Sequence, residues 1–575
     1  MKVVLFDLGD TLEHQDTLLP GAVETLTSIS RIRDEDHQSV TMGLVSDFDM
    51  PQSPAEIPAI RQRYLAILDN LRIRDLFEPV DVGVTLSTEV GVDKPDPRVF
   101  RAALDKFSPG LAFESAMFVT ENQGHVLAAR SLGVRAVHFA SAPGASGDIT
   151  TLTDLIPLVH AFVSPPPVAT GIAPWNAAAV GRDDATSWAR FGDDVFLIDP
   201  PDPAGVTRHA STTLRRGQEV PRGHLRLVIQ CGRSFQKAHP DVPVLLDHGR
   251  FLVVAVDPPL EATLHDGGGT RFAIRSLPDR QVVFTSSPSG QGRAAPVPWI
   301  RALVDGVSRA PYEADLAHLA SYPTRHSTSD SYRQAAAWVG RQFEDMGYEV
   351  RTQAITIDGR ASLNVIADRP GQRSGGREVV LATAHLDSVN HDGGGGPNVP
   401  APGADDNASG SAGVLQLARS LRAHPAAEDR RLILFGGEEQ NLLGSRDYVT
   451  GLSTAERARI RAVVNMDMIG CLNRAPASVL LEGAAVSQTV IDGLAQAAAT
   501  YTGLVVETSQ QPWGSDHVPF IEADLPAMLT IEGADQANKN EHSERDRIDT
   551  VSFDLALEIL RMNVAFIAAE LGTLA

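Results

Sequence analysis

Hydrophobic and polar positions follow a regular alternation in the first quarter of the chain. Short apolar runs predict strands, and stretches with helical spacing lie between them. We expect strands at 3–6, 41–45 and 116–119, and helices at 22–29 and 98–106. Strands that alternate with helices in this way are typical of a parallel sheet with helices on both faces. The N-terminal part is therefore predicted to be a Rossmann-like α/β domain.

The pattern changes in the middle of the chain. Short β-type runs follow one another there, separated by turn residues: LRLVIQ, VPVLLD, RFLVVAVD, TRFAIRS and RQVVFTS. This segment is predicted to be β-rich, and it carries no chemical motif. The C-terminal part returns to α/β alternation, with a helix expected at 330–346 and a strand at 348–352.

Two stretches rich in proline and small residues divide the sequence, at 164–174 and 287–298. Such composition favours extended linkers over packed structure. The sequence therefore predicts three domains: an α/β domain at 1–162, a β-rich domain of unassigned role at 163–296, and an α/β domain at 297–575 whose sheet is mixed.

The charge balance excludes some classes of partner. The chain has 575 residues, with 50 Lys+Arg against 72 Asp+Glu and a net charge of −22. Nucleic acid and anionic membrane both favour a basic face, so neither is expected as a partner. The N-terminal apolar run contains Asp7, and no apolar run reaches the length of about 18 residues that spans a membrane. We therefore expect a cytoplasmic protein.

Cysteine is too scarce for a disulfide scaffold or a thiolate zinc cluster. Only Cys231 and Cys471 are present, and their redox state stays open. The sequence also gives no signal for the oligomeric state.

The first domain carries residues typical of phosphotransfer. Asp7 ends the first strand, Ser46 ends the strand MGLVS, and Lys94 lies in GVDKPDP. Together with AARSLGVRAVHF downstream, these residues resemble the haloacid dehalogenase-like hydrolase superfamily over about 1–140. The resemblance implies that Asp7 attacks the substrate, that Ser46 and Lys94 hold the oxyanion, and that further acids bind magnesium.

This domain departs from the superfamily pattern at two places. Gly9 stands where phosphatases have an acid two residues after the nucleophile. The late metal motif reads VTENQGHV, so Glu121 is the one acid left there, with His125 near the second position. We therefore expect an inactive or structural domain in which magnesium is doubtful. The alternative is a working magnesium phosphohydrolase, which would make the protein bifunctional.

The C-terminal part places histidine or acidic residues after three successive apolar strands. His385 and Asp387 follow VVLATA, Glu438 and Glu439 follow RLILF, and Asp467 ends AVVNMD. Side chains at i and i+2 of a strand point the same way, so a carboxylate at 387 can orient the imidazole at 385. Two further candidates are Asp406 in GADDNASG and His542 in NKNEHSERD. Nitrogen and oxygen ligands without cysteine suit catalytic zinc.

These motifs resemble the co-catalytic di-zinc aminopeptidases of clan MH, of the bacterial leucyl-aminopeptidase type. The resemblance covers about 300–575. It implies that His385 and Asp467 hold one zinc, that Glu439 and His542 hold the other, and that Asp406 bridges the two. It also implies that Asp387 orients His385 and that Glu438 is the general base.

The implied activity is that of a zinc-dependent exopeptidase. Its substrates would be peptides with a free N-terminus, attacked by a hydroxide that bridges two zinc ions per chain. The segment WGSDHVPF resembles the wall of a specificity pocket, with Trp513 and Phe520 as candidate substrate contacts. We expect structural roles for Asp516 and His517 in the same segment.

Glu541 precedes the last histidine ligand, where some relatives have a tyrosine that stabilises the oxyanion. A second hypothesis is a glutaminyl-cyclase-like acyltransferase, which uses a related fold and one zinc.

Overall fold

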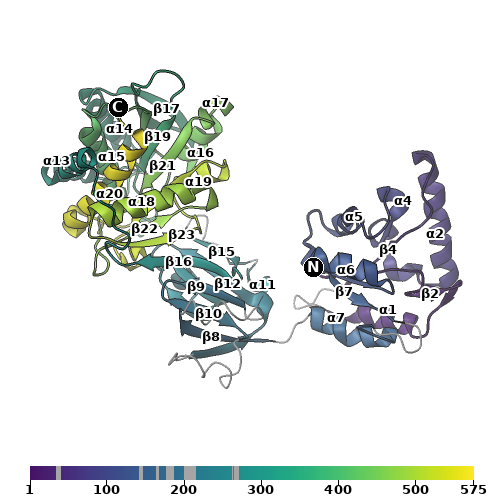
Figure 1. The fold of residues 1–575 in the computed structure, drawn as a ribbon. Coiled ribbons are helices and arrows are strands. Elements are labelled where there is room, and N and C mark those ends of the chain that lie inside the picture. The colour runs from purple at the N-terminus through teal and green to yellow at the C-terminus, as the bar shows by residue number, and fades with distance from the viewer. Residues whose placement is uncertain are drawn as a thin grey trace. The chain divides into compact units, whose positions relative to one another are not determined.

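The computed structural model describes residues 1–33, 40–140, 147–163, 167–175, 187–199, 215–261, 263–264 and 271–574. These residues divide into two compact units (Figure 1). Unit 1 comprises 1–168, 221–224 and 257–263, and unit 2 comprises 169–220, 225–256 and 264–575. Part of the first expected linker, 164–166, lies outside the described residues. The division into three domains stays a prediction.

Unit 1 contains a five-stranded sheet in the order β5-β4-β1-β6-β7. Every neighbouring pair is parallel. The strands are β1 (Val3–Phe6), β4 (Thr41–Ser46), β5 (Val84–Leu86), β6 (Ala116–Thr120) and β7 (Arg135–His138). A two-stranded ribbon of β2 (Glu13–His14) and β3 (Thr17–Leu18) follows β1.

Both faces of this sheet are covered because alternate residues of β1 point to opposite sides. Val4 and Phe6 pack with α1 (Ala22–Arg31), α2 (Ile57–Leu71) and α7 (Leu155–Val163). Val3 and Leu5 pack with α5 (Pro97–Phe107) and α6 (Gln123–Ser131). Two short helices complete the unit, α3 (Val80–Gly83) and α4 (Ser87–Val90). The observed architecture is the α/β arrangement that the alternation predicts.

Unit 2 is organised by a 13-stranded sheet in the order β11-β8-β10-β9-β16-β23-β22-β24-β21-β19-β20-β18-β17. The first five come from the β-rich segment: β8 (Val168–Pro174), β9 (Ser187–Phe191), β10 (Asp194–Ile198), β11 (Arg215–Val220) and β16 (Gln281–Ser287). The others are β17 (Glu349–Ile357), β18 (Arg360–Arg369), β19 (Val379–His385), β20 (Asp429–Phe435), β21 (Ile460–Met466), β22 (Ser478–Glu482), β23 (Val505–Ser509) and β24 (Ala527–Glu532). The sheet is mixed, because β19 is parallel to β20 and β21 while β18 is antiparallel to β20.

The β-rich segment also forms a small antiparallel sheet in the order β13-β14-β12-β15. Its strands are β12 (Leu225–Gln230), β13 (Val244–His248), β14 (Phe251–Ala255) and β15 (Phe272–Ser276), with the short helices α10 (Ser234–Ala238) and α11 (Pro258–Glu261). All five β-type runs of the sequence form strands. The last run forms β16, which belongs to the large sheet and pairs there with β23.

Helices cover both faces of the large sheet around β19. Val380, Ala382 and Ala384 face one core, and Val379 and Leu381 face another. The first core contains α12 (Pro298–Asp305), α13 (Arg309–Ala320), α14 (Asp330–Asp345), α15 (Gly410–Leu421), α18 (Gln488–Tyr501) and α20 (Phe553–Leu571). The second contains α16 (Leu443–Thr450) and α19 (His517–Glu522), and α17 (Thr454–Arg457) lies nearby in the chain. Within the described ranges, no helix combines the length and apolarity needed to cross a membrane.

Arg250 joins the β-rich segment to the rest of unit 2. Its guanidinium donates to both carboxylate oxygens of Glu482, at 3.0 and 3.1 Å, and to Asp535 at 2.8 Å. It also donates to the backbone oxygen of Trp513 at 3.1 Å. The three charged side chains are at most 5% exposed. Removing one member of such a buried network leaves the other charges uncompensated.

We expect Arg250→Ala to lower the free energy of unfolding by about 3–5 kcal/mol, because Glu482 and Asp535 would stay buried without their cation. Urea unfolding measures this change. The control is Arg309→Ala, because Arg309 is 54% exposed in its pair with Glu313 and should cost less than about 1 kcal/mol. Equal losses for the two variants would contradict the buried-network interpretation.

Candidate metal centre

Three neighbouring parallel strands bring their carboxyl ends to one edge of the large sheet. His385 is the last residue of β19, Asp467 directly follows β21, and Glu438 and Glu439 lie in the loop after β20. Since β19 pairs in parallel with both β20 and β21, these side chains converge. The sheet edge is the place where α/β folds commonly bind ligands.

Asp406 lies between two histidines. It belongs to an irregular turn, residues 404–409, that leads into α15. Its Oδ1 is 3.2 Å from His385 Nε2, and its Oδ2 is 2.9 Å from His542 Nε2. The same imidazole nitrogens are 3.1 Å from Asp467 Oδ1 and 3.0 Å from Glu439 Oε2. The residues thus form two sets of donors that share one carboxylate.

The donor set fits zinc. Each set holds one imidazole nitrogen, one carboxylate of its own and one oxygen of Asp406, which are nitrogen and oxygen ligands that zinc accepts. Ligand atoms of His385, Asp406 and Glu439 all lie within 4.8 Å of one another. Glu439 Oε1 is buried and has no hydrogen-bond partner among the described residues. A buried carboxylate oxygen without a partner is expected where a metal ion binds.

The electrostatics of the cluster favour a cation. Burial alone would lower the pKa of His385 and His542, but the carboxylates around them outweigh burial and raise both pKa values well above normal. Burial raises the pKa of Glu439 to about 7 and that of Glu438 well above its usual range. Burial would also raise the pKa of Asp406, yet hydrogen bonds from the two histidines hold it well below its usual value.

Asp387 fixes both a candidate ligand and the loop that carries Glu438 and the candidate ligand Glu439. Its Oδ1 is 3.5 Å from His385 Nδ1, and its carboxylate accepts the backbone N–H groups of Gly437, Glu438 and Glu439 at 3.1, 3.4 and 3.3 Å. Asp387 is fully buried. A carboxylate in this position sets the orientation of a ligating imidazole and raises its basicity.

Two residues that sequence reasoning missed hold the acidic ligands. Asp546 accepts the backbone N–H groups of Asp405 and Asp406, each at 2.9 Å. Ser515 donates its hydroxyl to Asp467 Oδ2 at 2.7 Å. The available signal for Asp546 was its place four residues after His542, in the same acidic segment.

His391 is a further neighbour that the sequence did not single out. Its ring is perpendicular to that of His542, with 4.7 Å between ring centroids, and its backbone N–H donates to the His542 carbonyl at 2.9 Å. A ligand nitrogen of His391 lies within 4.8 Å of ligand atoms of Glu439 and His542. Burial, together with the positive charges of His542 and Arg271, lowers the pKa of His391 to about 3.

Trp513 and Phe520, the candidate substrate contacts of the segment 513–520, lie in different surroundings. Trp513 is almost buried beneath Arg250, whose guanidinium carbon is 5.8 Å from the ring centroid. Phe520 has no exposed surface and packs with Phe435 and Tyr448, so its ring offers nothing for a substrate to contact. Asp516 and His517 are fully buried as well.

The sequence-predicted residues of unit 1 also come together. Lys94 Nζ is 2.6 Å from Asp7 Oδ2, and both side chains are buried. The Glu121 carboxylate accepts the Thr11 hydroxyl at 2.6 Å. Ser46 lies 2.7 Å from the hydroxyl of Tyr64, at the end of β4. Burial raises the pKa of Asp7 in spite of the lysine beside it.

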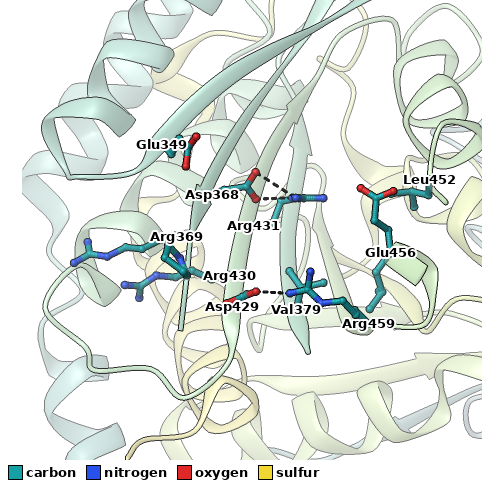
Figure 2. Close-up of a pocket in the computed structure, with 12 residues that line it drawn as sticks. Glu349, Asp368, Arg369, Val379, Asp429, Arg430, Arg431, Leu452, Glu456 and Arg459 are labelled. Atoms are coloured by element: carbon teal, nitrogen blue, oxygen red, sulfur yellow. Dashed lines mark hydrogen bonds and ion pairs between the residues drawn. The ribbon is translucent and has the colours of Figure 1, made fainter. Parts of the chain in front are cut away.

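A separate cavity of about 270 Å³ lies at the amino-terminal ends of the central strands of the large sheet, opposite the ends that carry the candidate ligands. Residues that begin the central strands line it, among them Val379, Asp429 and Ile460. Figure 2 shows two of its arginines paired with acids, Arg431 with Asp368 and Arg459 with Asp429. The other two, Arg369 and Arg430, donate to backbone oxygens instead. This cavity lies away from the ligand cluster.

The candidate ligands lie in a part of the chain whose sequence matches a known protein family. Residues 364–567 match the sequence model of Peptidase family M28. This stretch, the M28 region, contains all the candidate ligands. Two curated proteins are similar to part of this chain: Leupeptin-inactivating enzyme 1 of Streptomyces exfoliatus, 33% identical over 261 residues, and Aminopeptidase YwaD of Bacillus subtilis (strain 168), 31% identical over 196 residues.

These alignments cover only parts of each protein. The first spans 42% of this chain and 55% of the relative, and the second spans 34% and 41%. Among solved structures, a zinc aminopeptidase from Bacillus subtilis is 17% identical with a TM-score of 0.41, covering 46% of this chain and 95% of that one. A Porphyromonas gingivalis glutaminyl cyclase is 19% identical with a TM-score of 0.39, covering 46% and 99%. Scores this low do not decide between the two activities.

We expect Asp546→Asn to weaken zinc binding to the M28 region by about 10- to 100-fold. An asparagine amide keeps one acceptor oxygen but turns a donor towards one of the two N–H groups that now hold the Asp406 turn. Competition with a zinc-chelating dye measures the affinity. The control is Asp549→Asn, a nearby exposed residue. Unchanged affinity in Asp546→Asn would show that Asp546 does not position the ligands.

Proposed function

We propose that unit 2 is a zinc-dependent aminopeptidase that binds two zinc ions per chain. The observation that supports this most is the position of Asp406, with one oxygen towards each histidine. His385, Asp467 and Asp406 would hold one ion, and Glu439, His542 and Asp406 the other. When bound, such ions acidify water and polarise the scissile carbonyl group.

Glu438 is the proposed general base. It follows the Asp387-bound turn and is buried beside the ligand cluster, and burial raises its pKa well above the usual range. A carboxylate with a raised pKa can accept a proton from water and return it to the leaving amine. The excess of carboxylates around the centre would also attract the positive N-terminus of a peptide.

The glutaminyl-cyclase-like alternative requires one zinc per chain. Two complete donor sets around Asp406 favour two ions, and hydrolysis, over that alternative. Metal content therefore discriminates between the hypotheses without reference to substrate.

We expect Glu438→Gln to lower kcat for leucine p-nitroanilide by about 10²- to 10⁴-fold, because the amide cannot take up the proton. Elemental analysis should still find two zinc ions per chain in the variant, since Glu438 is not a proposed ligand. A chelator should abolish the wild-type activity.

Two outcomes would contradict this proposal. Full activity of Glu438→Gln would exclude it as the base. One zinc per wild-type chain, with cyclisation of N-terminal glutamine, would instead favour the acyltransferase.

We also propose that residues 1–162 form a haloacid dehalogenase-like domain without phosphotransfer activity. The resemblance is supported by the ion pair of Lys94 with Asp7 at the carboxyl ends of parallel strands, where Ser46 also ends β4. The loss of activity is supported by Gly9 and by Glu121, whose carboxylate is engaged by the hydroxyl of Thr11. Asp7 therefore has a cation beside it, but glycine stands at position 9 in place of the acid that would protonate a leaving group.

We expect the wild-type protein to release no p-nitrophenol from p-nitrophenyl phosphate above background in the presence of magnesium, because that acid is missing. Asp7→Asn should leave the peptidase rate within about twofold of wild type, since Asp7 is not one of the proposed zinc ligands. Phosphatase activity that Asp7→Asn removes and Glu438→Gln keeps would instead establish a bifunctional enzyme.

A further inference from the structure

A cavity of about 340 Å³ opens beside the ligand His542, inside unit 2. One wall comes from the β-rich segment: the turn at 231–234, α10 and the start of β15. The other wall consists of residues 391–392 and 538–545. The volume lies at the lower end of the range of roughly 300–1,000 Å³ that small-molecule sites occupy.

The walls of this cavity are strongly basic, although the chain as a whole carries −22. Five cationic side chains line it: Arg233, Lys237, Arg271, Lys539 and Arg545. Only two carboxylates line it, Asp392 and Glu541, and Asp392 already pairs with Arg545 at 3.1 Å. Two of the five lysines in the sequence lie here, and the Lys237 ammonium makes no ion pair or hydrogen bond within the described part of the chain.

The basic wall is held in place by the fold. The backbone oxygen of Arg271 accepts the Cys231 N–H at 3.0 Å and the Ser234 hydroxyl at 2.6 Å. Arg233 donates from Nε to Gln236 of α10 at 3.0 Å, and it also forms an ion pair with Asp247 of β13. Arg233 and Lys237 therefore come from an ordered turn and helix that line the cavity beside His542.

The cavity adjoins the metal centre directly. His542 itself lines it, and so does His391, whose ring contacts that of His542. The turn of the β-rich segment approaches this point, because a Cβ added to Gly232 would lie 3.4 Å from Glu541 Oε2. An occupant of the cavity would therefore lie beside a zinc ligand.

We infer that this cavity binds a carboxylate of the peptide substrate, so that the enzyme prefers acidic or short peptides. The inference rests on the proposed aminopeptidase function. The acidic cluster would attract the positive N-terminus of a substrate, and the basic cavity would attract a carboxylate of the same substrate. An extended residue spans about 3.3–3.6 Å, so the carboxylate could be an acidic side chain near the N-terminus or the C-terminus of a dipeptide or tripeptide.

Two pairs of substrates test the inference and separate these sources. Leu-Gly is compared with Leu-Gly-amide, and glutamyl with glutaminyl p-nitroanilide. Each pair is measured with the full-length zinc protein and with the double variant Lys237→Glu/Lys539→Glu. The control double variant Arg309→Glu/Arg461→Glu changes the net charge equally, at two exposed arginines that do not line the cavity.

We expect the carboxylate form of at least one pair to have a KM about tenfold lower in the wild type and in the control. The lysine double variant should lose this preference, which the control double variant keeps. The pair that shows the preference identifies the source of the carboxylate. Absence of a preference in both pairs, or a preference that survives in the lysine variant, would overturn the inference.

A binding measurement keeps this test independent of turnover. Calorimetric titration of Leu-Gly and Leu-Gly-amide into zinc-loaded Glu438→Gln compares their affinities directly. Tighter binding of the acid supports the inference even where the wild type hydrolyses no aminoacyl substrate, which would overturn only the proposed peptidase function. Equal binding of both, together with equal binding of free glutamate and glutamine, would overturn the inference.

Discussion

The position of the Asp406 carboxylate governs the arrangement of unit 2 around the candidate metal centre. Its two oxygens face His385 and His542, which come from a central strand and from a distant loop. This carboxylate can face both imidazoles only if the turn before α15 is held still. Asp546 does this by accepting two successive backbone N–H groups of that turn. Asp546 and His542 belong to one short segment. That segment therefore positions the candidate ligand His542 and also holds the turn that carries Asp406.

Asp387 has the same double function on the other side of the cluster. It faces His385 and also accepts three backbone N–H groups from the loop that carries Glu438 and Glu439. Buried carboxylates repel one another unless a cation or several N–H groups lie close to them. The cluster contains both kinds of compensation, which explains how so many acids can lie together in the interior.

Much of this arrangement could be predicted because strand ends are visible in a sequence. Apolar runs that stop at His385, Glu438 and Asp467 indicate one sheet edge, and the structure brings those residues together. Long-range partners leave no such pattern: nothing around Arg250 indicates Glu482, and Asp546 lies in an irregular loop. The helix α13 was not predicted because Asp315 interrupts its apolar face, and Arg419 compensates that buried acid at 2.8 Å.

The pairing of β16 with β23 has a consequence for the boundaries of the M28 region. The M28 region ends its own sheet at β23, and the β-rich segment supplies the next strand. A chain that began at residue 297 would expose the N–H and C=O groups of β23 along an open edge, which promotes association with other chains. It would also lack the cation between Glu482 and Asp535. The M28 region therefore depends on a strand and a cation that lie before residue 297 in the chain.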